Sequence, residues 1–102
     1  MPVNIVTSGS KITAYINGEI DHHNAPAVRD CIDFAIDNVQ PKTVALDFSA
    51  VTFMDSSGVG LVMGRYKNAR RYSAQLEVHG LSGNSEKIMR MSGLEKLVKF
   101  VK

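Results

Sequence analysis

The sequence contains one cysteine in 102 residues and no apolar run long enough to cross a bilayer. A single thiol, Cys31, excludes an internal disulfide and suits a reducing compartment. The longest stretch of apolar residues and glycine runs only from Gly58 to Gly64, whereas a membrane-spanning helix needs about 20 residues. The N-terminus has neither the basic flank nor the apolar core of a signal peptide. We therefore expect a soluble, cytoplasmic protein without a membrane span.

An excess of charge of one sign is also missing, since the formal net charge is only +2. Acids outnumber bases in residues 1–40, and bases outnumber acids in residues 41–102. Four bases gather toward the end of a predicted helix, where positive charge complements the helix dipole: Arg65, Lys67, Arg70 and Arg71. Because no interleaved aromatic residues or nucleic-acid motif accompany them, we interpret them as a solvated helix end and expect no nucleic-acid partner.

The composition is that of one globular domain. Hydrophobic residues make up 44% of the chain and charged residues 22%, which argues against disorder. The chain contains no linker, repeat or low-complexity segment. We expect residues 1–102 to form a single domain.

Hydrophobic periodicity predicts five strands and three helices. Alternation with period two and short apolar runs place the strands near residues 3–6, 12–16, 43–48, 76–78 and 98–100. Apolar residues at helical spacing place the helices near residues 24–39, 57–72 and 84–91. Asn24 is the predicted N-cap of the first helix, and Gly93 follows the third helix in the usual left-handed capping place. Residues 7–10 are predicted to form a turn, and residues 18–23 a loop.

This order of elements predicts an α/β fold. The sheet should be mixed and mostly parallel, with about five strands, an opening hairpin and three helices. In such sheets the loops after parallel strands lie at one edge, where ligands and partners bind. The loop that contains Asp21, His22 and His23 and the turn at residues 55–56 should therefore be neighbours.

The segment Met54-Asp55-Ser56-Ser57-Gly58 lies where an apolar strand leads into a helix. A helix N-terminus leaves backbone N–H groups unpaired and favours anions, so a serine there can cap the helix or accept a phosphate. These residue types are common in ordinary turns, and a plain N-cap role for Ser56 or Ser57 is the more frequent case. The segment alone leaves both interpretations open.

Catalytic and metal-binding alternatives find less support. A serine hydrolase could use Ser56 with a histidine, but the G-x-S-x-G motif is absent. A phosphoacceptor aspartate at Asp47 would need Mg²⁺ and an acidic pair after the first strand. Because the sequence has no such pair there, we expect Asp47 to be a hydrogen-bonding residue at a strand end. His22 and His23 have only His79 as a further histidine, so we expect no metal site and water-exposed histidines.

Three small residues on predicted helices have packing interpretations. Cys31 falls on an apolar helix face and is expected to be a buried hydrophobe. Gly60 and Gly64 lie one turn apart and weaken their helix. They predict close approach by another backbone, either from the sheet or from a docked partner.

Four blocks of sequence together resemble one family. Residues 18–23, 53–60, 64–67 and 91–94 follow each other in the order and spacing of the anti-sigma factor antagonists, the single-domain bacterial form of the STAS fold. Within that family the chain is most similar to the sporulation anti-anti-sigma factors that act on sigma F. Family members often carry a further helix after the last strand, whereas this sequence ends at Lys102.

The resemblance implies a regulator without a cofactor and without catalytic activity of its own. The unphosphorylated form would bind an anti-sigma factor that is also a serine kinase, with ATP or ADP bound to the kinase, and so release the sigma factor. Phosphorylation of Ser56 would end binding, and a PP2C-type phosphatase would reverse it. A general-stress antagonist or a scaffold STAS protein is the alternative. The expected partner-binding residues lie in the two neighbouring loops and the following helix turn: Asp21, His22, His23, Asn24, Asp55, Ser56, Ser57, Gly58 and Gly60.

Overall fold

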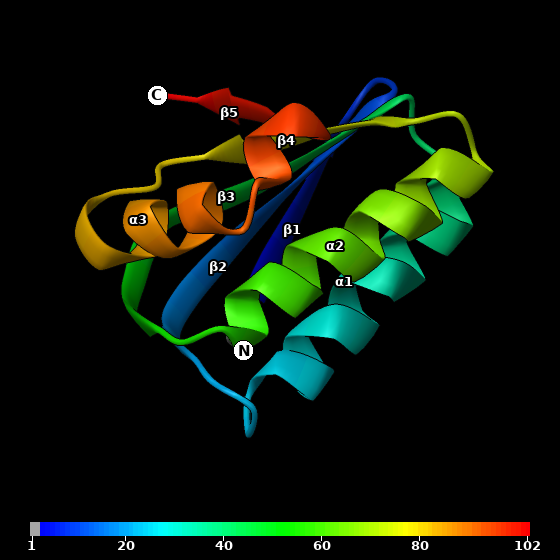
Figure 1. Ribbon diagram of the computed structural model, residues 1–102. Coiled ribbons are helices and arrows are strands. Elements are labelled where there is room, and N and C mark those ends of the chain that lie inside the picture. Colours follow the sequence, from blue (N-terminus) through cyan, green and yellow to red (C-terminus); the bar gives the residue numbers. More distant parts are fainter. Residues whose placement is uncertain (1–2) are drawn as a thin grey trace.

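The computed structural model describes residues 3–102 and has the predicted order of elements (Figure 1). Its strands are β1 (Val3–Ser8), β2 (Lys11–Ile20), β3 (Thr43–Met54), β4 (Gln75–His79) and β5 (Lys99–Val101). Its helices are α1 (Ala25–Val39), α2 (Ser57–Arg71) and α3 (Gly83–Met91), followed by a short 3₁₀ turn, η1 (Leu94–Lys96). The predicted α/β fold with five strands and three helices is therefore confirmed.

The sheet is mixed, with strands in the order β1-β2-β3-β4-β5. β1 and β2 form an antiparallel hairpin, and every later neighbour pair is parallel. The three crossovers step across the sheet in the same direction, and right-handed connections of this kind place all helices on one face. Figure 1 shows α1, α2 and α3 on the same side of the strands. The core lies between that side of the sheet and the helices.

Three strands are longer than the sequence predicted. β1 continues to Ser8 through the first half of the turn expected at residues 7–10. β2 continues to Ile20 through the expected loop at residues 18–23, and β3 continues to Met54 through residues 49–53. The pairing of β2 with β3 shifts register twice, between Tyr15 and Asn17 and between Gly18 and Glu19. Gly18 takes a left-handed φ of 80°, a conformation that glycine adopts without strain. Bulges therefore let β2 and β3 continue where alternation in the sequence is broken.

Asp47 stabilises the first of these bulges. It lies within β3 and not at a strand end, so the predicted position was wrong, although its hydrogen-bonding role is confirmed. Its Oδ1 accepts a hydrogen bond from the backbone N–H of Ser49 at 2.9 Å and another from the Ser49 hydroxyl. The carboxylate thereby satisfies an N–H group close to the point where the β2–β3 register shifts.

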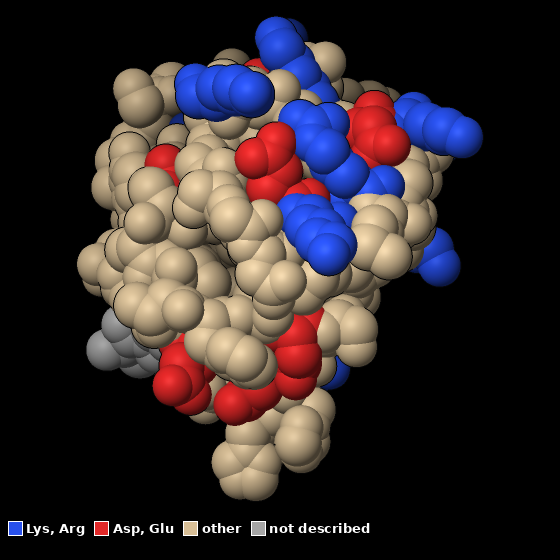
Figure 2. Space-filling view, turned by 60° about the vertical axis from the view of Figure 1, so that its left-hand side comes forward, with Lys and Arg blue, Asp and Glu red and all other residues tan. Residues whose placement is uncertain are grey.

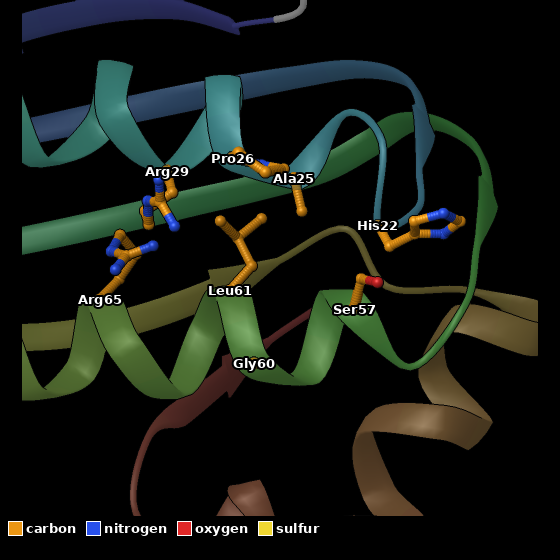
Figure 3. A pocket seen from close by; sticks show the side chains of 8 residues that line it. All are labelled: His22, Ala25, Pro26, Arg29, Ser57, Gly60, Leu61 and Arg65. Atoms are coloured by element: carbon orange, nitrogen blue, oxygen red, sulfur yellow. The ribbon is translucent and has the colours of Figure 1, made fainter.

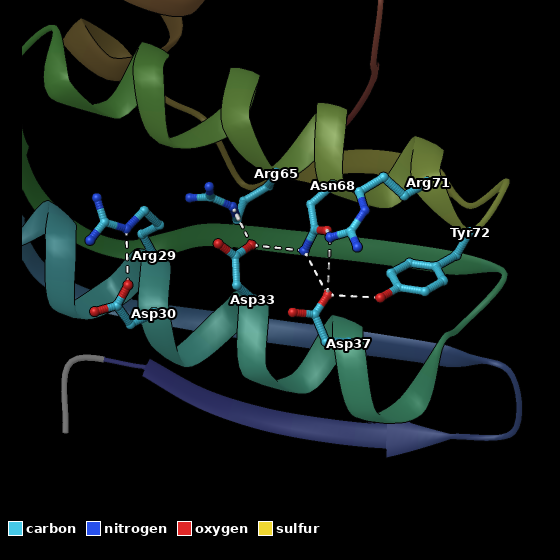
Figure 4. A network of polar contacts seen from close by, with 8 residues as sticks. All are labelled: Arg29, Asp30, Asp33, Asp37, Arg65, Asn68, Arg71 and Tyr72. Carbon is cyan, nitrogen blue, oxygen red and sulfur yellow. Dashed lines mark hydrogen bonds and ion pairs between the residues drawn. The ribbon is translucent and has the colours of Figure 1, made fainter.

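A polar network joins α1 to α2 and corrects the prediction of a solvated helix end for Arg65 alone, because the other three bases are exposed as expected (Figure 4). Asn68, which is buried, donates hydrogen bonds to Asp33 at 3.0 Å and to Asp37 at 3.3 Å. Arg71 donates to Asn68 at 3.0 Å, and Arg65 is only 6% exposed beside Asp33. Only Lys67 and Arg70 of the four bases are surface residues outside this network. Charge complementarity between the two helices therefore accounts for the positions of Arg65 and Arg71.

Two further packing predictions need correction. Cys31 is half-buried against the core and not fully buried. A Cβ atom at Gly60 or Gly64 would meet nothing within 4 Å, so the sheet does not approach either glycine closely. Gly58 is the glycine of α2 whose place is crowded, because a Cβ there would overlap the side chain of buried Met54.

Candidate functional site

The loop after β2 and the turn after β3 lie side by side, as the sequence predicted. Ile20 and Met54 are the last paired residues of the two parallel strands. The next backbone N–H, that of Asp55, donates to the carbonyl of Ile20 at 3.1 Å. This bond fixes the start of the β3–α2 turn against the end of β2, so Asp21 and Asp55 begin neighbouring segments.

The turn into α2 is capped by an aspartate and not by a serine. Asp55 Oδ1 accepts a hydrogen bond from the N–H of Ser57 at 2.8 Å, and the Asp55 carbonyl accepts from the N–H of Gly58 at 3.1 Å. Ser56 occupies the N-cap position with helical backbone angles, and its side chain makes no capping hydrogen bond. Ser56 therefore has the N-cap position that one interpretation expected, but its side chain does not cap the helix.

The two serines differ in their surroundings. Ser56 is exposed, whereas Ser57 is half-buried and lines a cavity between α1 and α2 (Figure 3). The Ser56 hydroxyl is accessible at the positive end of a helix and is not needed for the turn. That arrangement suits a site of modification, because a group attached there breaks no hydrogen bond of the fold.

Asp21 organises the neighbouring loop in the same way. Its Oδ1 accepts hydrogen bonds from the N–H groups of His23 and Asn24, both at 2.9 Å. The bond from Asn24 is the largest cause that lowers the pKa of Asp21 below its ordinary value; slight burial opposes it and the bond from His23 adds to it. Asn24 stands at the N-cap of α1 as predicted, but its side chain donates to the carbonyl of Glu19 at 3.2 Å and makes no cap bond.

The histidines do not converge. His22 and His23 are exposed, with their rings 5.5 Å apart and nearly perpendicular. His79 lies on β4, where its Nε2 is 2.8 Å from Glu77 Oε1. Within residues 3–102 no three His, Cys, Asp or Glu side chains are grouped as metal ligands.

Charge is unevenly distributed over the face that contains these loops. Glu19, Asp21 and Asp55 fall in or next to the two loops. Figure 2 shows a group of acidic side chains at the lower end of one face, where few basic side chains lie, and a mixture of basic and acidic side chains toward the upper end. A negative group added at Ser56 would therefore join existing negative charge.

A cavity of about 220 Å³ opens between the N-terminal halves of α1 and α2. His22 and Ser57 lie at one end of it and Arg29 and Arg65 at the other, as Figure 3 shows. Between them it is lined by Ala25, Pro26, Gly60 and Leu61. Neither arginine was predicted from the sequence to line a cavity. Arg65 follows Leu61 by four residues, and this helical spacing could have placed it on the inward face.

The longest helices of the described region, α1 and α2, have 15 residues each, and no helix in residues 3–102 could cross a membrane.

The mixed five-stranded sheet with helices on one face has the architecture of the STAS fold. The sequence model of the STAS domain matches residues 3–102, and the chain belongs to this family. The family prediction drawn from the four sequence blocks is therefore confirmed.

Named relatives belong to two regulatory systems. The chain is 35% identical over 83 residues to the anti-sigma F factor antagonist of Paenibacillus polymyxa, covering 81% of this chain and 71% of the relative. It is 30% identical over 88 residues to the anti-sigma-B factor antagonist of Listeria monocytogenes, covering 85% of this chain and 75% of the relative.

The fold also matches two solved structures of SpoIIAA. The structure described as the unphosphorylated anti-sigma factor antagonist aligns with a TM-score of 0.83 and 28% identity, over 98% of this chain and 88% of that chain. The structure described as the phosphorylated form aligns with a TM-score of 0.75 and 28% identity, over 98% and 91%.

Proposed function

We propose that this chain is an anti-sigma factor antagonist that is switched off by phosphorylation of Ser56. Its unphosphorylated form binds an anti-sigma factor with serine kinase activity, which carries ATP or ADP, and thereby frees a sigma factor. The chain is a substrate and a binding partner and not a catalyst. A PP2C-type phosphatase restores the binding form. The names of the two relatives and the phosphorylated form of SpoIIAA support this assignment.

We choose Ser56 as the phosphoacceptor because its hydroxyl makes no capping hydrogen bond. The side chain is exposed at the first turn of α2, while Asp55 supplies the cap. Ser57 is half-buried and less accessible to a kinase. A phosphate on Ser56 therefore changes the surface without removing a bond of the fold.

The binding surface in this proposal consists of the two neighbouring loops and the exposed start of α2. Asp21, His22, His23 and Asn24 contribute from one loop, and Asp55, Ser56, Ser57, Gly58 and Gly60 from the turn and the helix. At Gly60 the open space above the helix allows a partner's backbone to approach. Gly58 acts indirectly, because its packing against Met54 fixes the turn.

Electrostatic repulsion is the proposed mechanism of release. A phosphoserine adds roughly −1.5 to −2 charges. Opposite a partner carboxylate about 6 Å away, at an effective dielectric of about 20, each unit charge contributes about 2–3 kcal/mol of repulsion. The dipole of α2 offsets only about 0.3–1 kcal/mol of this. The affinity then falls tenfold to a hundredfold or more without a change of fold, and added salt restores part of it.

The test is a reaction with candidate anti-sigma kinases and ATP, followed by peptide mass spectrometry. We expect one phosphate on Ser56 and none on Ser57. Ser56→Ala should bind the kinase permanently, and Ser57→Ala, its matched control, should still be phosphorylated. Modification of Ser57, or none with any kinase that binds the chain, would falsify the assignment.

The choice between sigma factors needs the same assay with two kinases. Sporulation control through sigma F is the proposed role, favoured by the higher identity to the Paenibacillus relative. General-stress control through sigma B is the second candidate, favoured by the Listeria relative. The chain should bind only one of the two kinases and be phosphorylated by it, and the identity of that kinase decides between sigma F and sigma B.

A further inference from the structure

Two guanidinium groups share one end of the cavity between α1 and α2. Arg29 reaches it from α1 and Arg65 from α2, and Figure 3 shows the two side chains pointing toward each other. Like charges placed together in this way repel each other, and a cavity that keeps them there favours an anion between or beside them.

The buried arginine is incompletely satisfied. The side chain of Arg65 is only 7% exposed. Its Nε forms a 2.8 Å ion pair with Asp33 Oδ1, but the geometry is poor for a hydrogen bond, so within residues 3–102 this buried nitrogen is paired by charge and not well hydrogen-bonded. Buried charges in proteins are normally both paired and fully hydrogen-bonded, which makes this an uncommon feature.

The neighbouring carboxylates do not complete the arrangement. Asp33 is shared, since it also accepts a hydrogen bond from Asn68 at 3.0 Å. Asp30 pairs with Arg29 at 3.0 Å, with its own side chain 73% exposed and on the solvent side. Burial lowers the pKa of Arg65, Asp33 raises it in part, and Arg29 lowers it further. Each guanidinium therefore has one carboxylate beside it, Asp33 for Arg65 and Asp30 for Arg29, and Asp33 divides its oxygen between Arg65 and Asn68.

The remaining walls fit a small ligand with an anionic group. Ala25, Pro26 and Leu61 form an apolar middle section, and the cavity holds about 220 Å³. Gly60 leaves one side open, because a Cβ there would meet no atom within 4 Å.

We propose that this cavity binds a small oxyanion, a phosphate or a carboxylate, through the guanidinium groups of Arg29 and Arg65. The binding uses only this chain and does not depend on a kinase partner or on Ser56. If the cavity binds no anion, the proposed phosphorylation of Ser56 is unaffected. Anion binding in turn does not require that phosphorylation.

The test is an NMR titration of the isolated chain at constant ionic strength, with sodium chloride replaced by one of two probes. Inorganic phosphate represents a free ion, and butyrate represents a carboxylate on a short aliphatic stem. We expect saturable shifts of the Arg65 Nε–H and of the amides near Arg29 and Gly60. Tighter phosphate binding identifies a free-ion site, and tighter butyrate binding shows that the apolar section contributes. Absence of saturable shifts with both probes overturns the proposal.

Variants give an independent check. Arg29→Met and Arg65→Met should each weaken binding about tenfold or more, because charge-assisted hydrogen bonds are lost. Lys67→Met removes an exposed charge from the same helix and should have no such effect.

Two glycine variants on α2, which add volume without removing a charge, keep the test decisive if Arg65→Met does not fold. Gly60→Leu should fill the cavity and abolish saturable binding. Gly64→Leu, in equally open space one turn further along α2 and outside the cavity, should preserve it. Unchanged affinity in Gly60→Leu, or in a folded Arg65→Met, contradicts the assignment.

Discussion

Replacing Asp55 by alanine should destabilise the domain, whereas replacing its neighbour Ser56 should not. The Asp55 carboxylate accepts the 2.8 Å hydrogen bond from the N–H of Ser57 and places negative charge at the start of α2. Loss of such a cap costs about 0.5–2 kcal/mol. The Ser56 side chain makes no capping bond, so Ser56→Ala should change the free energy of unfolding by less than about 0.5 kcal/mol.

A conservative variant separates the hydrogen bond from the charge. Asp55→Asn keeps an acceptor oxygen and loses only the interaction with the helix dipole, about 0.3–1 kcal/mol, so its stability should lie between wild type and Asp55→Ala. In a domain of this size 1 kcal/mol corresponds to about 4–8 °C in Tm. Thermal and urea unfolding, followed by circular dichroism, measure all three variants. If Ser56→Ala lost as much stability as Asp55→Ala, the serine would be the cap and this reasoning would be refuted.

Three further predictions concern the stability of the domain. Folding lowers the pKa of Asp21 from its ordinary value of 3.8, so the ionised carboxylate stabilises the domain above that pH, and this contribution is lost as the pH falls through the folded pKa. Asp21→Ala should therefore flatten the acid side of the stability–pH curve, measured by urea unfolding at several pH values. Asn68→Ala should cost about 1–3 kcal/mol because the bridge between α1 and α2 loses its donor and acceptor, whereas exposed Lys67→Ala should stay within about 0.5 kcal/mol in the same assay. Gly58→Ala should lower Tm, because overpacking against the core costs about 1–3 kcal/mol. Gly60→Ala should raise Tm, because alanine has the higher helix propensity and nothing crowds that position. A higher Tm for Gly58→Ala than for Gly60→Ala would contradict the crowding at Gly58.

The fold was predictable because the periodicity of apolar residues along the sequence is clear. Ile12, Ala14 and Ile16 alternate in the sequence and are all buried in the structure. Residues 43–48 form the first half of β3, as their mostly apolar character indicated. The closeness of the two site loops followed from the parallel direction of their strands. Such predictions need only the side-chain pattern, which local sequence contains.

Features that depend on tertiary geometry were missed. Aspartate and serine are equally good capping residues, so the sequence of the turn could not decide that Asp55 caps α2 and leaves Ser56 free. The bulges of β3 interrupt alternation, so the predicted strand ended at residue 48 and its second half was not predicted. Arg65 was interpreted from its charge as a surface residue, although its spacing from Leu61 and Ala69 places all three on the buried face.

The division of roles between Asp55 and Ser56 has a consequence for how a switch at this turn can work. If a serine hydroxyl were the cap, phosphorylation would have to break a hydrogen bond of the fold, and the modification would be coupled to the stability of α2. Because the carboxylate holds the turn, a phosphate on Ser56 adds charge and volume at the surface while the backbone bonds from Ser57, Gly58 and Val59 remain in place. The same carboxylate lies beside the new group and adds to the negative potential that a partner meets. In the proposed switch, a turn built in this way would make release an electrostatic event at the interface, and Asp55 would serve both the fold and the switch.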